Sequence, residues 1–144
     1  MIISEVMTRE VRVASPDDTL QSAARVMEAE DFGSLPIAEN ERLVGMLTDR
    51  DITIRAVARG LPPQGAKVRE VMSTEVRYVY DDESIRDVAQ VMGDLHVRRL
   101  PVLSRDKRLV GIVSLGDLAL AKPTSAGDAL QSIAEAPTPV SAAS

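Results

Sequence analysis

The sequence lacks the residues on which several classes of protein depend. It has no cysteine and one histidine, His96, so disulfides and thiol chemistry are excluded and a histidine-rich metal site is not expected. No apolar run reaches the roughly 18 residues of a membrane-spanning helix, and the N-terminus has no basic-then-apolar signal pattern. We therefore predict a soluble, cytoplasmic protein that engages neither a membrane nor a metal ion.

Aromatic side chains are also scarce, and acidic residues outnumber basic ones. Phe32, Tyr78 and Tyr80 are the only aromatic residues, so a slot for a nucleobase would have aliphatic walls instead of stacked rings. The formal net charge is −5, which argues against broad binding to the phosphate backbone of nucleic acid. A local basic pocket on an acidic protein can still hold an anion, so nucleotides stay possible ligands.

The most informative feature that the chain does contain is an internal repeat. The matched segments, first copy then second, are residues 6–12 and 71–77, 35–37 and 100–102, and 43–51 and 109–117. Two copies are too few for a solenoid, which needs three or more to bury a continuous core. The sequence instead predicts two similar lobes related by a pseudo-two-fold axis. We expect a first repeat at residues 1–59, a linker at 60–66, a second repeat at 67–122 and a tail at 123–144.

Each repeat predicts the order strand, helix, strand, strand, helix, which is an α/β (α+β) class with a small mixed sheet and two packed helices. The expected strands are residues 10–14, 34–38 and 43–47, then 75–80, 99–103 and 109–113. Thr19 and Ser84 are expected to cap the first helix of each repeat, and residues 49–59 form a helix that Gly60 ends. The tail contains a weak helix near residues 128–135, and we expect disorder from Pro137 onward.

Two matching motifs are the candidates for chemistry. Gly45-x-x-Thr48-x-x-Asp51 and Gly111-x-x-Ser114-x-x-Asp117 each place a hydroxyl and a carboxylate where a strand ends and a helix begins. The free N–H groups of a helix start suit a phosphate, and a carboxylate there can accept hydrogen bonds from a ribose. The same spacing is also a capping pattern that only starts a helix. The residues alone leave both interpretations open.

These motifs resemble those of cystathionine-β-synthase (CBS) domains, and the pair is similar to a Bateman module of the stand-alone bacterial kind. The resemblance covers residues 3–122 and rests on Val-Met before the first strand, Leu-Pro-Ile or Leu-Pro-Val in the middle, and Gly-x-x-Thr/Ser-x-x-Asp at the end. The segments Gly-Met-Leu-Thr-Asp-Arg-Asp and Val-Arg-Arg-Leu-Pro-Val are especially similar to that kind.

The resemblance implies sites for adenosine-containing ligands, commonly AMP, ADP or ATP, and less often S-adenosylmethionine or a dinucleotide such as NAD. It assigns the ribose to Asp51 and Asp117, and the ribose or phosphate to Thr48 and Ser114. It assigns the adenine edge to the backbone of Val11 to Val13 and of Val76 to Tyr78. It assigns the phosphate to Arg98 and Arg99. The first repeat departs from this pattern, because Gly33 and Ser34 stand where the second has its arginine pair.

We therefore expect a non-enzymatic sensor of adenine nucleotides, without catalytic residues, because nothing in the sequence pairs with His96 and no phosphate loop is present. The alternative is a ligand-free structural or interaction protein. CBS pairs usually form homodimers through apolar helical faces, and any output would pass through an effector protein or a change of assembly. The candidate faces, which could also serve only the internal core, contain Leu20, Ala24, Ile85, Ala89 and Met92.

Overall fold

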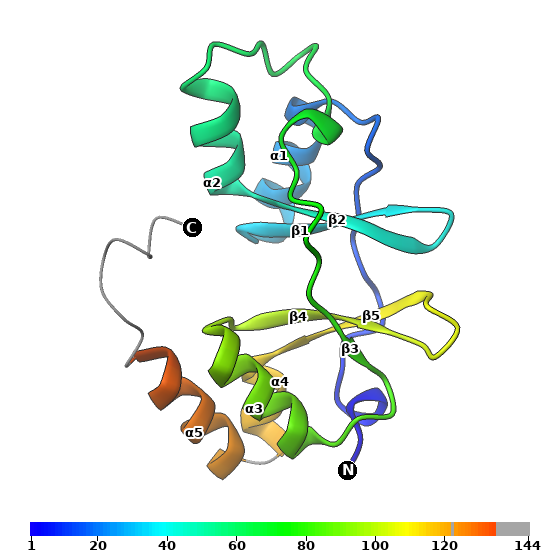
Figure 1. Cartoon of the computed structure of the whole chain (residues 1–144), viewed down its shortest axis with the longest axis vertical. Coiled ribbons are helices and arrows are strands. Elements are labelled where there is room, and N and C mark those ends of the chain that lie inside the picture. The colour runs from blue at the N-terminus through cyan, green and yellow to red at the C-terminus, as the bar shows by residue number, and fades with distance from the viewer. Residues whose placement is uncertain (122, 135–144) are drawn as a thin grey trace. The chain divides into compact units, whose positions relative to one another are not determined.

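The computed structural model describes residues 1–121 and 123–134. Its contacts divide the chain into two compact units, each holding most of one repeat. The first-repeat unit comprises residues 11–77 and 107–109, and the second-repeat unit comprises residues 1–10, 78–106 and the described residues 110–121 and 123–134. The predicted α+β class is confirmed: both units combine a small sheet with packed helices (Figure 1).

The first-repeat unit is built on an antiparallel hairpin of two strands. Its elements are α1 (Leu20–Glu30), β1 (Ser34–Glu39), β2 (Arg42–Thr48), the short α2 (Asp49–Asp51), the π-helical turn η2 (Ile52–Val57) and the 3-10 turn η3 (Val68–Glu70). The predicted helix at residues 49–59 is thus an α-helical turn that continues as a π-helix, followed by Gly60 at φ 74°.

The second-repeat unit has a three-stranded sheet in the order β3-β4-β5. Its elements are η1 (Ile3–Glu5), β3 (Val79–Tyr80), α3 (Ile85–Leu95), β4 (Arg99–Leu103), β5 (Leu109–Ser114), α4 (Leu115–Ala121) and α5 (Pro123–Ala134). The start of β5 contributes Leu109 to the other unit, where its backbone N–H donates to the carbonyl of Glu41 at 2.9 Å.

The predicted helix caps are confirmed. Thr19 Oγ1 accepts a hydrogen bond from the backbone N–H of Ser22 at 3.1 Å, and Ser84 Oγ accepts one from Asp87 at 3.0 Å. The stripe of apolar residues that follows each cap lies in the core of its unit, because residues three and four apart share a helix face. Its buried members are Leu20, Ala23 and Met27 in α1, and Ile85, Val88, Ala89 and Met92 in α3.

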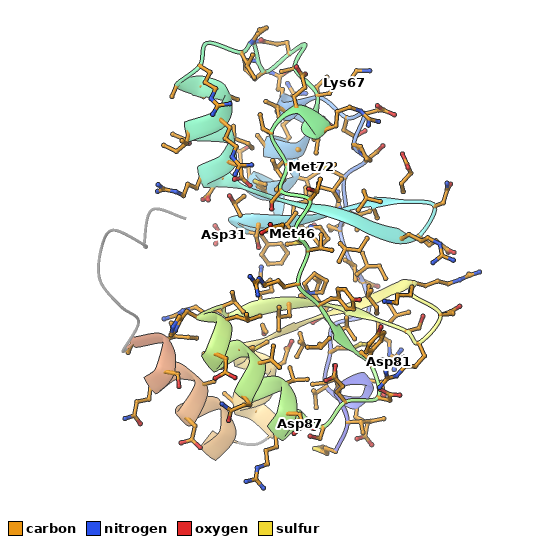
Figure 2. All side chains as sticks on the ribbon, viewed as in Figure 1. Asp31, Met46, Lys67, Met72, Asp81 and Asp87 are labelled. Atoms are coloured by element: carbon orange, nitrogen blue, oxygen red, sulfur yellow. The ribbon has the colours of Figure 1, made fainter. Side chains whose placement is uncertain are left out.

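The two units exchange segments of the repeats. Residues 1–10 begin the first repeat but belong to the second-repeat unit, where the backbone N–H of Thr8 donates to Ile112 at 2.8 Å. Residues 67–77 begin the second repeat but belong to the first-repeat unit, where the backbone N–H of Met46 donates to the carbonyl of Ser73 at 2.9 Å. Figure 2 labels Met46 of β2 and Met72 of the segment that pairs with β2 in the first-repeat unit.

The first strand of each repeat is shorter than the sequence predicts. Residues 10–14 make a single parallel bridge, from Ala14 to Ile37, and residues 75–80 reduce to β3, where Val79 pairs with Val102. The chain changes unit within both segments, after residue 10 and after residue 77. Their first residues therefore run as extended connections with no strand beside them in either sheet.

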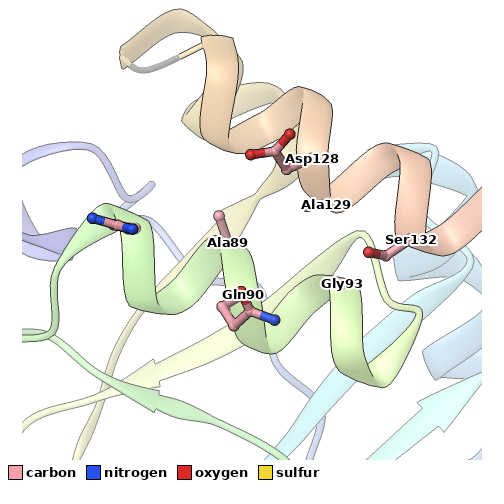
Figure 3. Close-up of a pocket in the computed structure, with 7 residues that line it drawn as sticks. Ala89, Gln90, Gly93, Asp128, Ala129 and Ser132 are labelled. Atoms are coloured by element: carbon pink, nitrogen blue, oxygen red, sulfur yellow. The ribbon is translucent and has the colours of Figure 1, made fainter.

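The tail contributes a longer helix than the sequence predicts. α5 spans Pro123–Ala134 and packs against α3 and α4, and Ala129 is 3% exposed. Gly93 of α3 allows this close contact, since a Cβ there would lie 3.2 Å from Ser132 Cβ. Figure 3 shows α3 and α5 side by side, with Ala89 and Gly93 facing Ala129 and Ser132. Glu135 and the expected disorder beyond Pro137 lie outside the described residues.

His96 is exposed and ends α3 in the left-handed conformation at φ 56°, a role that Asp31 fills after α1 with the same φ. Both are residue types enriched in that region, so His96 has a structural explanation.

Among residues 1–121 and 123–134, no helix is long and apolar enough to cross a membrane.

Candidate functional site

The first candidate corner lies where β2 meets α2. Thr48 Oγ1 accepts a hydrogen bond from the backbone N–H of Asp51 at 3.0 Å, and Asp51 Oδ2 accepts one from the backbone N–H of Thr48 at 2.9 Å. The two bonds form a reciprocal capping box that satisfies free N–H groups at the helix start. Asp51 is 16% exposed, and its Oδ1 lies 3.8 Å from Arg55 Nε.

The second candidate corner repeats this geometry where β5 meets α4. Ser114 Oγ accepts a hydrogen bond from the backbone N–H of Asp117 at 3.1 Å, and Asp117 Oδ2 accepts one from the backbone N–H of Ser114 at 2.9 Å. Asp117 is half-buried, and among the described residues no hydrogen bond or ion pair engages its second oxygen. The capping interpretation is therefore realised in both repeats, and each cap occupies only one oxygen of its carboxylate.

Arg98 lies next to the second corner through its backbone. The carbonyl of Arg98 accepts a hydrogen bond from the backbone N–H of Leu115, the first residue of α4, at 2.8 Å. The Arg98 side chain is exposed, and no ion pair with another described residue involves its guanidinium. Arg99 begins β4 and is half-buried. In the first repeat Gly33 takes the place of Arg98, and its carbonyl accepts from Asp49 at 2.9 Å.

The residues expected to border adenine fall into different units. Val11, half-buried, and Val13, 40% exposed, precede the Ala14 bridge in the first-repeat unit, which also contains Val76. Tyr78 belongs to the second-repeat unit, together with Arg98, Arg99, Ser114 and Asp117. Its ring meets that of Tyr80 edge-on, with the centroids 5.6 Å apart. The structure therefore divides the candidates between the two units, and the backbone contact of Arg98 with Leu115 joins Arg98 to the second corner.

Sequence reasoning gave the motif glycines no role, and the structure supplies one. A Cβ on Gly111 would lie 2.6 Å from Met7 Sδ and 2.9 Å from the carbonyl oxygen of Thr8. A Cβ on Gly45 would lie 2.8 Å from Met72 Sδ and 2.9 Å from the Ser73 carbonyl oxygen. The Val-Met marker of one repeat thus crosses the glycine of the other, and the recurrence of both markers was the signal that could have suggested it.

Two further ion pairs, also missed from the sequence, hold equivalent turns in the two repeats. The hydrogen bond from Arg69 lowers the pKa of Asp17, and the hydrogen bond from Arg105 lowers the pKa of Asp82. The Arg105 guanidinium also lies 4.1 Å from the centre of the Tyr80 ring. All four charged groups are exposed, so we assign these pairs to the turns before α1 and α3 and not to a binding site.

Both repeats match one known protein family. The CBS domain family matches residues 3–57 and 68–123, which is most of the chain. The chain belongs to the CBS domain family. The resemblance inferred from the sequence motifs is therefore confirmed.

The relatives of this CBS pair include proteins of similar length. It is 43% identical to the CBS domain-containing protein YhcV of Bacillus subtilis over 133 residues, which cover 91% of this chain and 94% of YhcV. It is 42% identical to hypoxic response protein 1 of Mycobacterium tuberculosis over 123 residues, 85% of each chain.

Two solved structures extend the comparison. Hypoxic Response Protein I, solved with two coordinated zinc ions, has a TM-score of 0.75 at 40% identity and covers 83% of this chain and 98% of its own. CBSX2 in complex with AMP has a TM-score of 0.73 at 22% identity, covering 85% and 96%, a likeness that shows the fold alone. Within the described part of this chain, no group of three or more His, Asp or Glu could hold a metal ion.

Proposed function

We propose that this CBS pair is a non-enzymatic regulatory module whose second repeat binds an adenosine-containing ligand. AMP, ADP and ATP are the first candidates, followed by NAD and S-adenosylmethionine. The observation that carries the proposal is the state of Asp117, whose one oxygen caps α4 while the other has no partner among the described residues. A half-buried carboxylate with an available oxygen is suited to accept hydrogen bonds from the cis hydroxyls of a ribose.

The neighbours of Asp117 support the same assignment. Ser114 is half-buried beside it, where its hydroxyl can meet ribose or phosphate. The backbone carbonyl of Arg98 contacts the N-terminus of α4, and the guanidinium of Arg98 is exposed. Arg99 is the next residue in the chain. The planar fork of arginine matches phosphate oxygens, so this cationic pair suits a phosphorylated ligand. Thr48 and Asp51 form the matching corner of the first repeat.

The adenine edge is assigned to extended backbone before the first pairing residue of each repeat. The segments around Val11 and Val13, and around Val76 and Tyr78, belong to no strand, so a base edge there would not compete with the hydrogen bonds of a sheet. The AMP complex of CBSX2 supports an adenine nucleotide only through the shared fold.

A ligand regulates this protein only if it binds one of two conformations better, and an effector protein or a change of assembly would transmit that difference. A cytoplasmic location stays a prediction of the sequence.

Calorimetry of the purified chain against AMP, ADP, ATP, NAD and S-adenosylmethionine tests the proposal. We expect saturable binding of at least one adenine nucleotide, with the nucleotide recovered unchanged after incubation. Absence of binding across the whole panel would instead indicate a ligand-free interaction protein, and nucleotide hydrolysis would contradict the non-enzymatic assignment.

The arginine pair gives a prediction that separates phosphate from adenosine. Replacing both Arg98 and Arg99 with alanine should weaken ATP binding by about tenfold or more, because charge-assisted hydrogen bonds contribute roughly 1.5–3 kcal/mol. Adenosine, which has no phosphate, should lose much less. Arg86→Ala removes an exposed positive charge from α3 of the same unit and is the matched control. Equal weakening of ATP and adenosine would assign the pair to the fold.

We also propose that the chain is a homodimer, but not through the residues first considered. Leu20, Ile85, Ala89 and Met92 are buried within the units. The better candidates are Ile54 in η2 and Leu120 in α4, which occupy the same position in the two repeats and are 48% and 91% exposed.

Light scattering at micromolar concentration should therefore give the mass of two chains, and Leu120→Glu should give the mass of one, because a buried charge opposes the contact. A wild-type protein with the mass of one chain would contradict the dimer. Ala119→Glu, a neighbouring exposed position on α4, is the control for the added charge.

A further inference from the structure

The two corners share one backbone arrangement. The first helical residue donates to the carbonyl before the strand in both repeats, Asp49 to Gly33 at 2.9 Å and Leu115 to Arg98 at 2.8 Å. The capping bonds also agree to within 0.1 Å, at 2.9 and 3.0 Å in the first corner and 2.9 and 3.1 Å in the second. Any difference in what the corners bind must therefore come from side chains at equivalent positions.

The first difference is at the carboxylate itself. In the first corner Arg55 Nε lies 3.8 Å from Asp51 Oδ1, and Arg55 Nη1 also donates to the Val71 carbonyl at 3.2 Å. The arginine is thus held between two acceptors, and it occupies the oxygen that the cap leaves available. In the second corner Ala121 stands at the position of Arg55, and it has no group that could engage Asp117.

The second difference is at the position of the phosphate-binding cation. Asp49 fills the space over Gly33, since its Oδ2 would lie 3.0 Å from a Cβ on that glycine. The first corner therefore has a carboxylate where the second has Arg98, and it has Asp49 where the second has the apolar Leu115. A carboxylate repels a phosphate, and a like charge at a few ångströms is unfavourable even near the surface.

We propose that the side chains of Arg55 and Asp49 close the first corner to phosphorylated ligands, so that each chain binds a single adenine nucleotide, at the second corner. The identity of the ligand in this inference rests on the proposed function. The closure itself rests on the contacts of Arg55 and Asp49. Arg50 is, after Arg55, a second cation of the first corner without an equivalent in the second, which has Gly116 at that position. Its side chain is exposed, and we assign it no contact with ligand.

Titration of AMP into wild type and into a chain carrying both Arg55→Ala and Asp49→Asn tests the proposal. We expect a single AMP per wild-type chain and a second, weaker binding event in the double variant. Adding Asp51→Asn to the double variant should weaken that second event by about tenfold, because the opened carboxylate would then be its ribose acceptor. Arg55→Gln, which keeps a hydrogen-bond donor near Val71, replaces Arg55→Ala if the alanine variant loses its native circular dichroism.

The outcomes separate this proposal from the proposed function. Two equivalent AMP sites in wild type would overturn the closure while leaving nucleotide binding intact. If wild type binds no adenosine ligand, the proposed function fails, but closure still predicts that the double variant gains AMP binding that Asp51→Asn removes. A double variant that gains nothing overturns the closure in either case. Loss of wild-type binding in Arg50→Ala would also contradict it, since that side chain is assigned no contact.

Discussion

Replacing Gly111 with alanine should lower the free energy of unfolding by about 1–3 kcal/mol, the usual effect of forcing a methyl group into a packed site. A Cβ there would lie 2.6 Å from Met7 Sδ and 2.9 Å from the Thr8 carbonyl oxygen. The methionine can move, but the carbonyl belongs to the backbone pairing between Thr8 and Ile112, so part of the strain persists. Urea denaturation measures the change through its midpoint.

The chain offers a matched control for this substitution. A Cβ on Gly65 would meet no atom of the described residues within 4 Å, so Gly65→Ala should leave stability unchanged or raise it by about 0.4–1 kcal/mol. Met7→Ala removes a buried core side chain and lowers stability by itself, so Gly111→Ala is also measured in a Met7→Ala background. There its cost should be smaller but not zero, because the Thr8 carbonyl stays in place. Equal midpoints for the Gly111 and Gly65 variants would show that the crossing of the Val-Met segment over the glycine is not tight.

Asp117→Asn should weaken AMP binding by about 10- to 100-fold, equivalent to roughly 1.5–3 kcal/mol for hydrogen bonds to a charged group. Asparagine keeps an acceptor for the Ser114 N–H but loses the charge, and one of its terminal atoms becomes a donor. The ligand-free protein should lose only about 0.3–1 kcal/mol of stability, through the weaker interaction with the helix dipole. Calorimetry and thermal melting measure the two effects separately.

Asp51→Asn is the matched control, because Asp51 forms the same capping box. It should produce a comparable stability loss with no change in AMP affinity. If both variants lose stability and neither loses affinity, the two aspartates are helix caps alone, and the main support for nucleotide sensing is removed.

Local sequence pattern predicted the elements that depend on nearby residues. The hairpins follow from short apolar runs around a charged turn, and α1 and α3 follow from a capping hydroxyl ahead of an apolar stripe. The capping geometry of Thr48–Asp51 and Ser114–Asp117 was one of two interpretations, and its hydrogen bonds are present. What a ligand does at these residues stays a prediction.

Features that depend on distant parts of the chain were not predictable in the same way. Residues 10–14 have the composition of a strand, but the chain changes unit after residue 10, so only Ala14 reaches a neighbour. The π-helical turn η2 has no distinctive local pattern. α5 is weakly marked in sequence because its packing depends on Gly93, which lies in another helix. In the sequence Arg55 is an ordinary charged residue of a predicted helix. Its role becomes visible only in the fold, where it contacts Asp51 and the carbonyl of Val71.

The exchange of segments means that one repeat is not by itself a unit of folding. A fragment of residues 1–59 would lack Val68 and Val71, which are 0% and 1% exposed in the core of the first-repeat unit. Two identical copies of such a fragment could satisfy each other by trading their N-terminal segments, as domain-swapped dimers do. The present chain has the arrangement expected if such a swapped ancestor were joined end to end, after which each copy was free to acquire different side chains at its corner.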